Sequence, residues 1–99
     1  MPTIPEGPGG RGGDAARLKT VAFYTKEECE LCERAWALLQ LLGAGRGFVV
    51  DRVDIGKAGG AILERYRDRV PVVRSPSGKE LDLWIDPVEL EMLLREVRG

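Results

Sequence analysis

The chain has 99 residues, of which 43% are hydrophobic and 31% are charged, and its formal net charge is −1. This length indicates a single domain, and the balance of 15 Lys and Arg against 16 Asp and Glu argues against nucleic-acid binding, which needs an excess of basic side chains. Because the sequence contains no histidine, Ser-His and Cys-His catalytic pairs and imidazole metal ligands are excluded.

Residues 1–16 are rich in Pro and Gly and cannot bury enough apolar surface to offset the entropy of ordering them. We therefore expect a flexible tail over 1–16 and one folded domain over 17–99. The first ten residues have neither the basic leader nor the apolar core of a signal peptide, and no apolar run approaches the roughly 18 residues of a spanning helix. Together these features predict a cytoplasmic protein without a membrane segment.

The first predicted elements are a strand, a helix and a second strand. The β-branched and aromatic segment 18–24 suits a strand, and a second strand follows over 48–55. In that second strand Val49, Val53 and Ile55 are expected to share a face. Between the strands, apolar residues recur at the spacing of one helix face, and glycines end that helix. This apolar face consists of Leu31, Ala35, Leu38, Leu39 and Leu42.

The second half of the domain predicts a helix, a hairpin and a last helix. The second helix runs over about 57–68, although two glycines near its start weaken its helix propensity. The strands 71–74 and 80–84 flank a Pro- and Gly-containing turn and form the hairpin. Asp86 caps the last helix, with Pro87 at its first position. The apolar positions of the two helices are Ile62, Leu63, Tyr66, Leu90, Leu93, Leu94 and Val97.

This order of elements, strand-helix-strand-helix-strand-strand-helix, predicts an α/β fold. The first two strands are expected to be parallel through a right-handed crossover, and the last two to be antiparallel. The expected sheet is therefore four-stranded, mixed and flanked by helices.

Cys29 and Cys32 lie between the first strand and the first helix. The first backbone N–H groups of a helix have no partner within the helix, and its amino end carries a positive potential, so a thiolate there is stabilised and its pKa falls. A second thiol one helical turn further on is close enough to attack a mixed disulfide. The pair therefore indicates redox chemistry that needs no histidine.

Two other interpretations of the cysteine pair stay open. A zinc site needs four ligands, so zinc would require carboxylates such as Glu30 and Glu33 or a dimer that pools two cysteine pairs. Alternatively, the thiols are inert and pack in the core as small apolar side chains. We expect no metal ion in the single chain.

The surroundings of the cysteine pair are acidic, and the sequence contains two tryptophans, one a helical turn after Cys32 and one at the end of the fourth predicted strand. Glutamates disfavour a thiolate, although water and salt screen exposed charges, so we expect them to soften the fall in the pKa of the Cys29 thiol. Trp36 and Trp84 are expected in the core or at its rim, with a substrate groove as the alternative. The four glutamates are Glu27, Glu28, Glu30 and Glu33.

Taken together, these motifs resemble a glutaredoxin-like member of the thioredoxin superfamily. The resemblance rests on the order of elements, on Cys29-x-x-Cys32 at the first helix and on Val70-Pro71 before the third strand. It implies a thioredoxin-like fold and thiol–disulfide oxidoreductase activity. The segments similar to small bacterial glutaredoxin-like proteins are 23–32, 53–55, 63–66 and 69–73, within a span of about 18–97.

The resemblance also implies roles for individual residues. Cys29 would be the attacking thiolate and Cys32 the resolving thiol. Pro71 would be the family's cis-proline, with the backbone of Val70 presented to an extended substrate. Lys26 would lie near the carboxylate of glutathione.

The chain departs from the family pattern at three places. Glu30-Leu31 stands between the cysteines where glutaredoxins usually have Pro-Tyr, and Arg69 stands where they have threonine. The Gly-Gly-x-x-Asp segment that holds the amino end of glutathione is reduced to residues 77–82, with a single glycine. These departures affect glutathione recognition more than disulfide exchange.

The resulting hypothesis is a monomeric thiol–disulfide oxidoreductase without a bound cofactor. Its expected partner is a disulfide-containing protein or a glutathione mixed disulfide, with glutathione or a reductase as the reductant, and neither nucleic acid nor a membrane is involved. Two alternatives stay open. One is a thioredoxin-fold binding module that recognises a partner without turnover, and the other is a dimer linked by metal through the cysteine pairs.

Overall fold

The computed structural model of the protein describes residues 20–97. The tail expected over 1–16 lies outside the described residues. None of the helices in the described part of the chain is long and apolar enough to cross a membrane.

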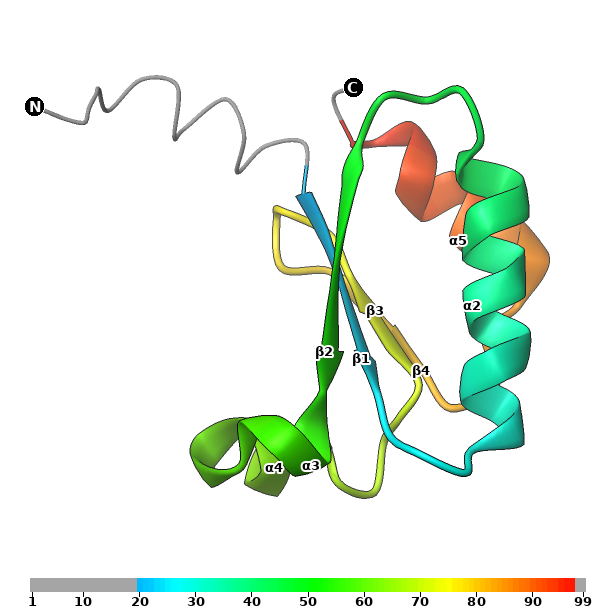
Figure 1. The fold of residues 1–99 in the computed structure, drawn as a ribbon. Helices are drawn as coiled ribbons and strands as arrows, with labels where there is room; N and C mark the ends of the chain where they lie inside the picture. Colours follow the sequence, from blue (N-terminus) through cyan, green and yellow to red (C-terminus); the bar gives the residue numbers. More distant parts are fainter. Residues whose placement is uncertain (1–19, 98–99) are drawn as a thin grey trace, which may run out of the picture.

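A four-stranded sheet in the order β2-β1-β3-β4 forms the centre of the structure (Figure 1). Strand β1 pairs with β2 in parallel and with β3 antiparallel, and β3 pairs with β4 antiparallel. The mixed sheet predicted from the sequence is therefore confirmed. Its strands are β1 (Thr20–Thr25), β2 (Val49–Asp54), β3 (Val72–Arg74) and β4 (Glu80–Asp82). The helices are α2 (Glu30–Gly43), α3 (Ile55–Ala58), α4 (Gly60–Tyr66) and α5 (Pro87–Arg95).

The helices cover the two faces of the sheet unequally. Helices α2 and α5 lie side by side on one face, whereas the short helices α3 and α4 lie across the other face, at the end of β2 (Figure 1). Alternate residues of the strands therefore enter two apolar clusters. The larger cluster, under α2 and α5, contains Val21, Phe23, Ala35, Leu39, Val73, Ile85, Leu90, Leu93 and Leu94. The smaller cluster contains Cys32, Ile55, Tyr66, Val70 and Val72.

Strand direction brings three loops to one end of the sheet. Because β3 is antiparallel to both β1 and β4, the end of β1, the start of β3 and the end of β4 lie together. The loops at this end are β1–α2, α4–β3 and β4–α5 (Figure 1). The β3–β4 turn lies at the opposite end, closed by a hydrogen bond from Ser75 N–H to the Lys79 carbonyl at 2.8 Å.

The single helix predicted over 57–68 is wrong, because the glycine pair divides it into α3 and α4. Gly59 and Gly60 have φ angles of 62° and 56°, which glycine adopts without the steric penalty of a side chain. The N–H of Gly59 donates to the Ile55 carbonyl, and its own carbonyl accepts from Leu63 N–H. Gly59 thus ends one helix and begins the next.

The apolar patterns of the second strand and of the first helix face are only partly correct. Val49 is 58% exposed, because it lies at the start of an edge strand while α3 and α4 lie at the end of that strand. Ile55 is buried, as the first residue of α3. Leu31 is 41% exposed, because it lies in the first turn of α2, at the loop end of the sheet.

The last helix forms as its sequence predicts. Asp86 Oδ2 accepts hydrogen bonds from the N–H groups of Val88 and Glu89, both at 3.0 Å, and Pro87 is the first helical residue. These bonds satisfy two of the donors that a helix start leaves unpaired. The predicted stripe of Leu90, Leu93 and Leu94 is buried.

Candidate functional site

Cys29 and Cys32 form a disulfide at the start of α2, with their Cα atoms 5.2 Å apart. Cys29 precedes the first turn and is half-buried, whereas Cys32 lies within the turn and is only 2% exposed. An incoming sulfur therefore reaches Cys29 more easily than Cys32. In this pair the Cys29 sulfur is the more accessible to solvent, and the Cys32 sulfur is buried.

The helix start provides hydrogen-bond donors for Cys29. Its backbone is extended, with φ −127° and ψ 104°, and its Sγ accepts a hydrogen bond from the Cys32 N–H at 3.2 Å. The Cys29 carbonyl accepts from Glu33 N–H at 3.1 Å, which closes the first turn. Cys29 is thus the amino-terminal cap of α2, a position where unpaired N–H groups and the helix dipole stabilise negative charge on sulfur.

The loop that leads into β3, residues 67–71, lies beside the disulfide and is called the proline loop. The Val70–Pro71 peptide bond is cis, as the resemblance implies, and Pro71 is fully buried. Val70 belongs to the same apolar cluster as Cys32, with Cys29 packed against that cluster. The N–H of Val70 already donates to the Tyr66 carbonyl at 3.2 Å.

Leu83 holds this loop from the β4 side, a contact that the sequence did not reveal. The strand predicted over 80–84 ends at Asp82, because Leu83 has a φ of 60°. Its N–H donates to the carbonyls of Arg69, at 3.2 Å, and of Pro71, at 3.0 Å. Leu83 therefore contacts the proline loop through its backbone. Residues 77–82, which the resemblance matches to the segment that holds the amino end of glutathione, begin in the β3–β4 turn at the other end of the sheet and reach this end only at Asp82 (Figure 1).

A network of charged side chains lies behind the proline loop. Glu80 Oε1 accepts from Arg69 at 2.6 Å, and Glu80 Oε2 accepts from the Tyr66 hydroxyl at 2.7 Å and from Arg74 at 3.3 Å. Arg69 also donates to Asp82 at 2.9 Å. Arg69 directly precedes Val70. Its side chain therefore links the proline loop to β4.

The pKa values of Glu80 and Tyr66 in this network both depart from their ordinary values. Burial by itself raises the pKa of the Glu80 carboxyl, but hydrogen bonds from Arg69 and Tyr66 and the nearby guanidinium charges outweigh burial and hold that pKa below its usual value. Burial, and then the hydrogen bond to Glu80, raise the pKa of the Tyr66 hydroxyl. Glu80 is therefore ionised and Tyr66 is protonated at neutral pH.

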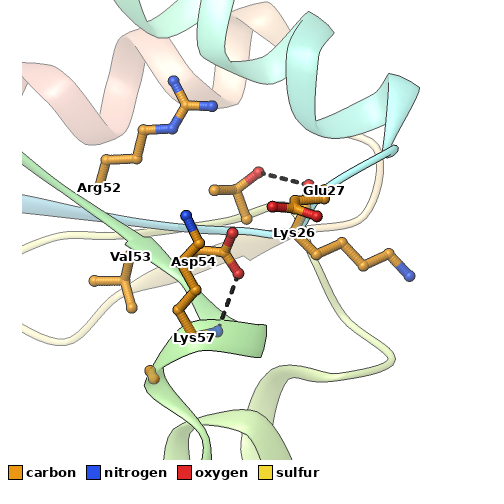
Figure 2. A pocket seen from close by; sticks show the side chains of 8 residues that line it. Lys26, Glu27, Arg52, Val53, Asp54 and Lys57 are labelled. Atoms are coloured by element: carbon orange, nitrogen blue, oxygen red, sulfur yellow. Dashed lines mark hydrogen bonds between the residues drawn. The ribbon is translucent and has the colours of Figure 1, made fainter.

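Lys26 lies on an open groove at the carboxyl ends of β1 and β2 (Figure 2). The groove has a volume of about 680 Å³, and Figure 2 shows Asp54 between Arg52 and Lys57. Asp54 Oδ1 accepts from the backbone N–H of Lys57 at 3.3 Å and so caps α3. The lining residues are Thr25, Lys26, Glu27, Arg52, Val53, Asp54, Lys57 and Ala58. Cys29 is not among the residues that line this groove.

The two tryptophans occupy different environments. Trp36 is partly buried against the larger cluster, with its ring 5.3 Å from that of Phe23, as expected for the rim of the core. Trp84 is 59% exposed, so a place in the core is wrong for this residue. The Arg34 guanidinium lies 3.5 Å from the Trp84 ring and donates to the Ile85 carbonyl at 2.8 Å.

The described residues offer no metal site within one chain. Among residues 20–97, no three or more Cys, Asp, Glu or His side chains lie close enough together to hold a metal ion. A metal-linked dimer would therefore need ligands from a second copy.

Comparison with known proteins agrees with this geometry. Residues 20–97 match the model of the family described as "Glutaredoxin-like domain (DUF836)". The chain belongs to this family. The crystal structure of a structural-genomics target protein from X. campestris is similar, with 33% sequence identity and a TM-score of 0.64, over 76% of this chain and 95% of that one. No curated protein matches the chain. The thioredoxin-like fold and the glutaredoxin-like character expected from the sequence are thereby confirmed.

Proposed function

We propose that the protein is a thiol–disulfide oxidoreductase that uses Cys29 and Cys32 as a dithiol. The observation that carries the proposal is the position of Cys29, which is accessible, caps α2 and is paired with the buried Cys32. Membership of a glutaredoxin-like family supports it. According to this proposal, the chain acts as an enzyme and not only as a binding module.

The reaction consists of two exchanges between sulfur atoms. The Cys29 thiolate attacks one sulfur of a substrate disulfide, a bond forms between them, and the other substrate sulfur leaves as a thiolate that takes up a proton. The Cys32 thiolate then attacks Cys29 Sγ and expels the second substrate sulfur, which is also protonated. The substrate gains two electrons and two protons, and the protein is left with the Cys29–Cys32 disulfide.

Three further residues are proposed to position the substrate. Because the Val70 N–H is already bonded to Tyr66, Val70 would offer its carbonyl to an extended substrate. Pro71 would form the wall beside the sulfurs. Lys26 would meet a carboxylate that extends from Cys29 into the groove of Figure 2.

The reaction also defines the proposed cellular context. A dithiol that must be regenerated suits a reducing compartment such as the cytoplasm, with glutathione or a reductase as the electron donor. The cysteines need no bound cofactor for these steps. The proposed substrate is a disulfide-containing protein or a glutathione mixed disulfide, handled by a monomer.

A redox titration of the purified full chain tests the proposal. The protein is equilibrated in glutathione buffers of increasing oxidation, alkylated, and weighed by intact mass spectrometry. We expect a two-electron conversion between the dithiol and the disulfide, with one midpoint. Cys29→Ser is expected to lose disulfide-reducing activity, and Cys32→Ser is expected to accumulate a mixed disulfide at Cys29.

The same series separates the alternatives. If both thiols stayed reduced throughout the titration, the oxidoreductase proposal would fail. If Cys29→Ser bound a partner as tightly as wild type and neither protein reduced disulfides, a binding module would replace it. Zinc or iron in the purified protein, lost together with a dimer when the thiols are alkylated, would favour the metal-linked dimer.

A further inference from the structure

Three exposed apolar side chains lie in the first turn of α2 and just after β4, at the end of the sheet where Cys29 lies (Figure 1). Leu31 lies between the two cysteines and is 41% exposed, while Leu83 and Trp84 are 48% and 59% exposed. We refer to these three side chains as the apolar patch. Large apolar side chains grouped at one exposed site mark interaction surfaces more often than scattered ones do.

Contacts across the fold hold this patch together. Arg34 follows Leu31 by one turn of α2, and its guanidinium lies against Trp84 and donates to the Ile85 carbonyl. Leu83 is tied to the proline loop by its bond to the Pro71 carbonyl. The β1–α2 and β4–α5 segments that carry the patch lie at the same end of the sheet (Figure 1).

The backbone at Leu83 keeps its side chain in solvent. A φ of 60° is uncommon for a residue with a branched side chain and carries a steric cost. The two hydrogen bonds from its N–H hold this conformation. A strained residue that exposes an apolar side chain and is bonded to the loop beside the disulfide is better explained by contact with a partner than by the stability of the domain.

Unpaired carboxylates lie next to the patch. Four exposed glutamates flank the cysteines, and none of their side chains forms an ion pair or hydrogen bond with any other residue of 20–97. Elsewhere in the described chain, Glu80 and Glu91 are each held by arginines. We refer to the four as the acidic rim, which consists of Glu27, Glu28, Glu30 and Glu33.

We propose that the substrate of this site is a protein disulfide flanked by lysine or arginine and by an apolar side chain. The inference deepens the proposed function and rests on it. The patch would take the apolar side chain, and the acidic rim would attract the basic ones. Glutathione, which carries two carboxylates and one ammonium group, has the opposite charge preference and is the poorer substrate.

The electrostatic part of the proposal predicts how rates depend on charge and salt. Complementary charge mainly raises the rate of association, by about tenfold or more at low ionic strength. Screening removes this effect, because the Debye length falls from about 30 Å at 0.01 M salt to about 3 Å at 1 M. The apolar contribution is not screened in this way and persists at high salt.

The experiment compares matched peptide disulfides as substrates of the reduced full-length protein. Each substrate is a pair of identical short peptides joined by one disulfide, with Lys or Glu, and Leu or Ser, next to the cysteine. Each turnover converts the protein dithiol to the disulfide and the substrate to two peptide thiols. We expect the Lys peptide to be reduced about tenfold faster than the Glu peptide at low salt, with the ratio approaching one at high salt.

Ratios of rates within one variant cancel changes in the intrinsic reactivity of the thiol. Glu28→Gln with Glu30→Gln is expected to reduce the Lys-to-Glu ratio several-fold, whereas the control Asp51→Asn with Glu96→Gln removes the same charge elsewhere and leaves the ratio unchanged. Leu83→Asn tolerates the left-handed backbone and is expected to abolish the preference for Leu over Ser. The control Leu41→Asn removes a leucine that is 73% exposed and preserves that preference.

The outcomes distinguish this inference from the proposed function. If Lys and Glu peptides were reduced at equal rates, or if oxidised glutathione were reduced as fast as the Lys peptide, the substrate assignment would be overturned while disulfide reduction stood. A Lys preference that did not change with salt would also overturn it. If the reduced protein reduced none of the disulfides, the proposed function itself would fail.

Discussion

Removal of one hydroxyl group, by Tyr66→Phe, tests whether the network behind the proline loop stabilises the fold. The Tyr66 hydroxyl donates to Glu80 Oε2 at 2.7 Å, and the Glu80 side chain is only 13% exposed, so water screens this bond little. Phenylalanine keeps the ring, which stacks on Tyr24 with 4.1 Å between centroids. The substitution therefore removes this hydrogen bond and the longer one that the hydroxyl accepts from Arg74 at 3.4 Å.

The expected loss follows from the partners that remain. A hydrogen bond to a charged group contributes about 1.5–3 kcal/mol. Because Glu80 keeps its bonds to Arg69 and Arg74, the carboxylate is not left unpaired and the lower part of that range applies. We expect the free energy of unfolding to fall by about 1.5–2 kcal/mol, which lowers the melting temperature of a domain this size by about 10 °C.

Urea denaturation of the oxidised protein at pH 7 measures this loss, as a shift in the midpoint at constant slope. Tyr24→Phe is the matched control, since the Tyr24 hydroxyl makes no hydrogen bond with the residues of 20–97 and should cost less than about 0.5 kcal/mol. Equal losses in the two variants would refute the assignment of the stabilisation to the Tyr66–Glu80 bond. A double-mutant cycle with Glu80→Gln then isolates the coupling between the two side chains.

The remaining predictions concern pH, packing and Arg34. Because the pKa of Glu80 is held below its ordinary value of 4.5, its ionised form stabilises the fold above pH 4.5, and this stabilisation is lost as the pH falls through the lowered pKa. The free energy of unfolding of Glu80→Gln should therefore fall less steeply with acid than that of wild type. Parallel curves for the two proteins would contradict this. Gly43→Ala places a Cβ 2.5 Å from Phe48 Cζ and should lower the free energy of unfolding by about 1–3 kcal/mol. In a Phe48→Leu background, the same substitution should lower it much less. An equal loss of stability in both backgrounds would disprove the clash. Arg34→Lys loses the stacked guanidinium and should shift the Trp84 fluorescence and cost about 1 kcal/mol. Arg95→Lys, whose exposed side chain pairs with Glu91, should do neither.

Features carried by neighbouring residues were predictable from the sequence. The caps Cys29 and Asp86 lie within three residues of the N–H groups that they accept. The weakness of the helix over 57–68 was visible in its glycine pair, although the division into two helices was not. The roles of Lys26, Val70 and Pro71 in binding stay predictions, and so do those of the two cysteines in catalysis.

Features that join distant segments were not predictable. Arg34 meets Ile85 across 51 positions, and Tyr66 meets Glu80 across 14, so neither contact leaves a periodic pattern in the sequence. The exposure of Leu31, Leu83 and Trp84 was missed because hydropathy alone places such residues in the core. Their position depends on where α2 and the β4–α5 loop meet the end of the sheet.

Apart from the division of the helix over 57–68, the sequence by itself determined the order of elements and the helix start that carries Cys29, because capping, turn formation and apolar spacing act over a few residues. Only the tertiary structure decided that the proline loop, the cysteine pair and the apolar patch meet at one end. That meeting depends on the sheet order β2-β1-β3-β4 and on the antiparallel direction of β3. Strand order and direction are set by burial across the whole domain, and no local segment encodes them.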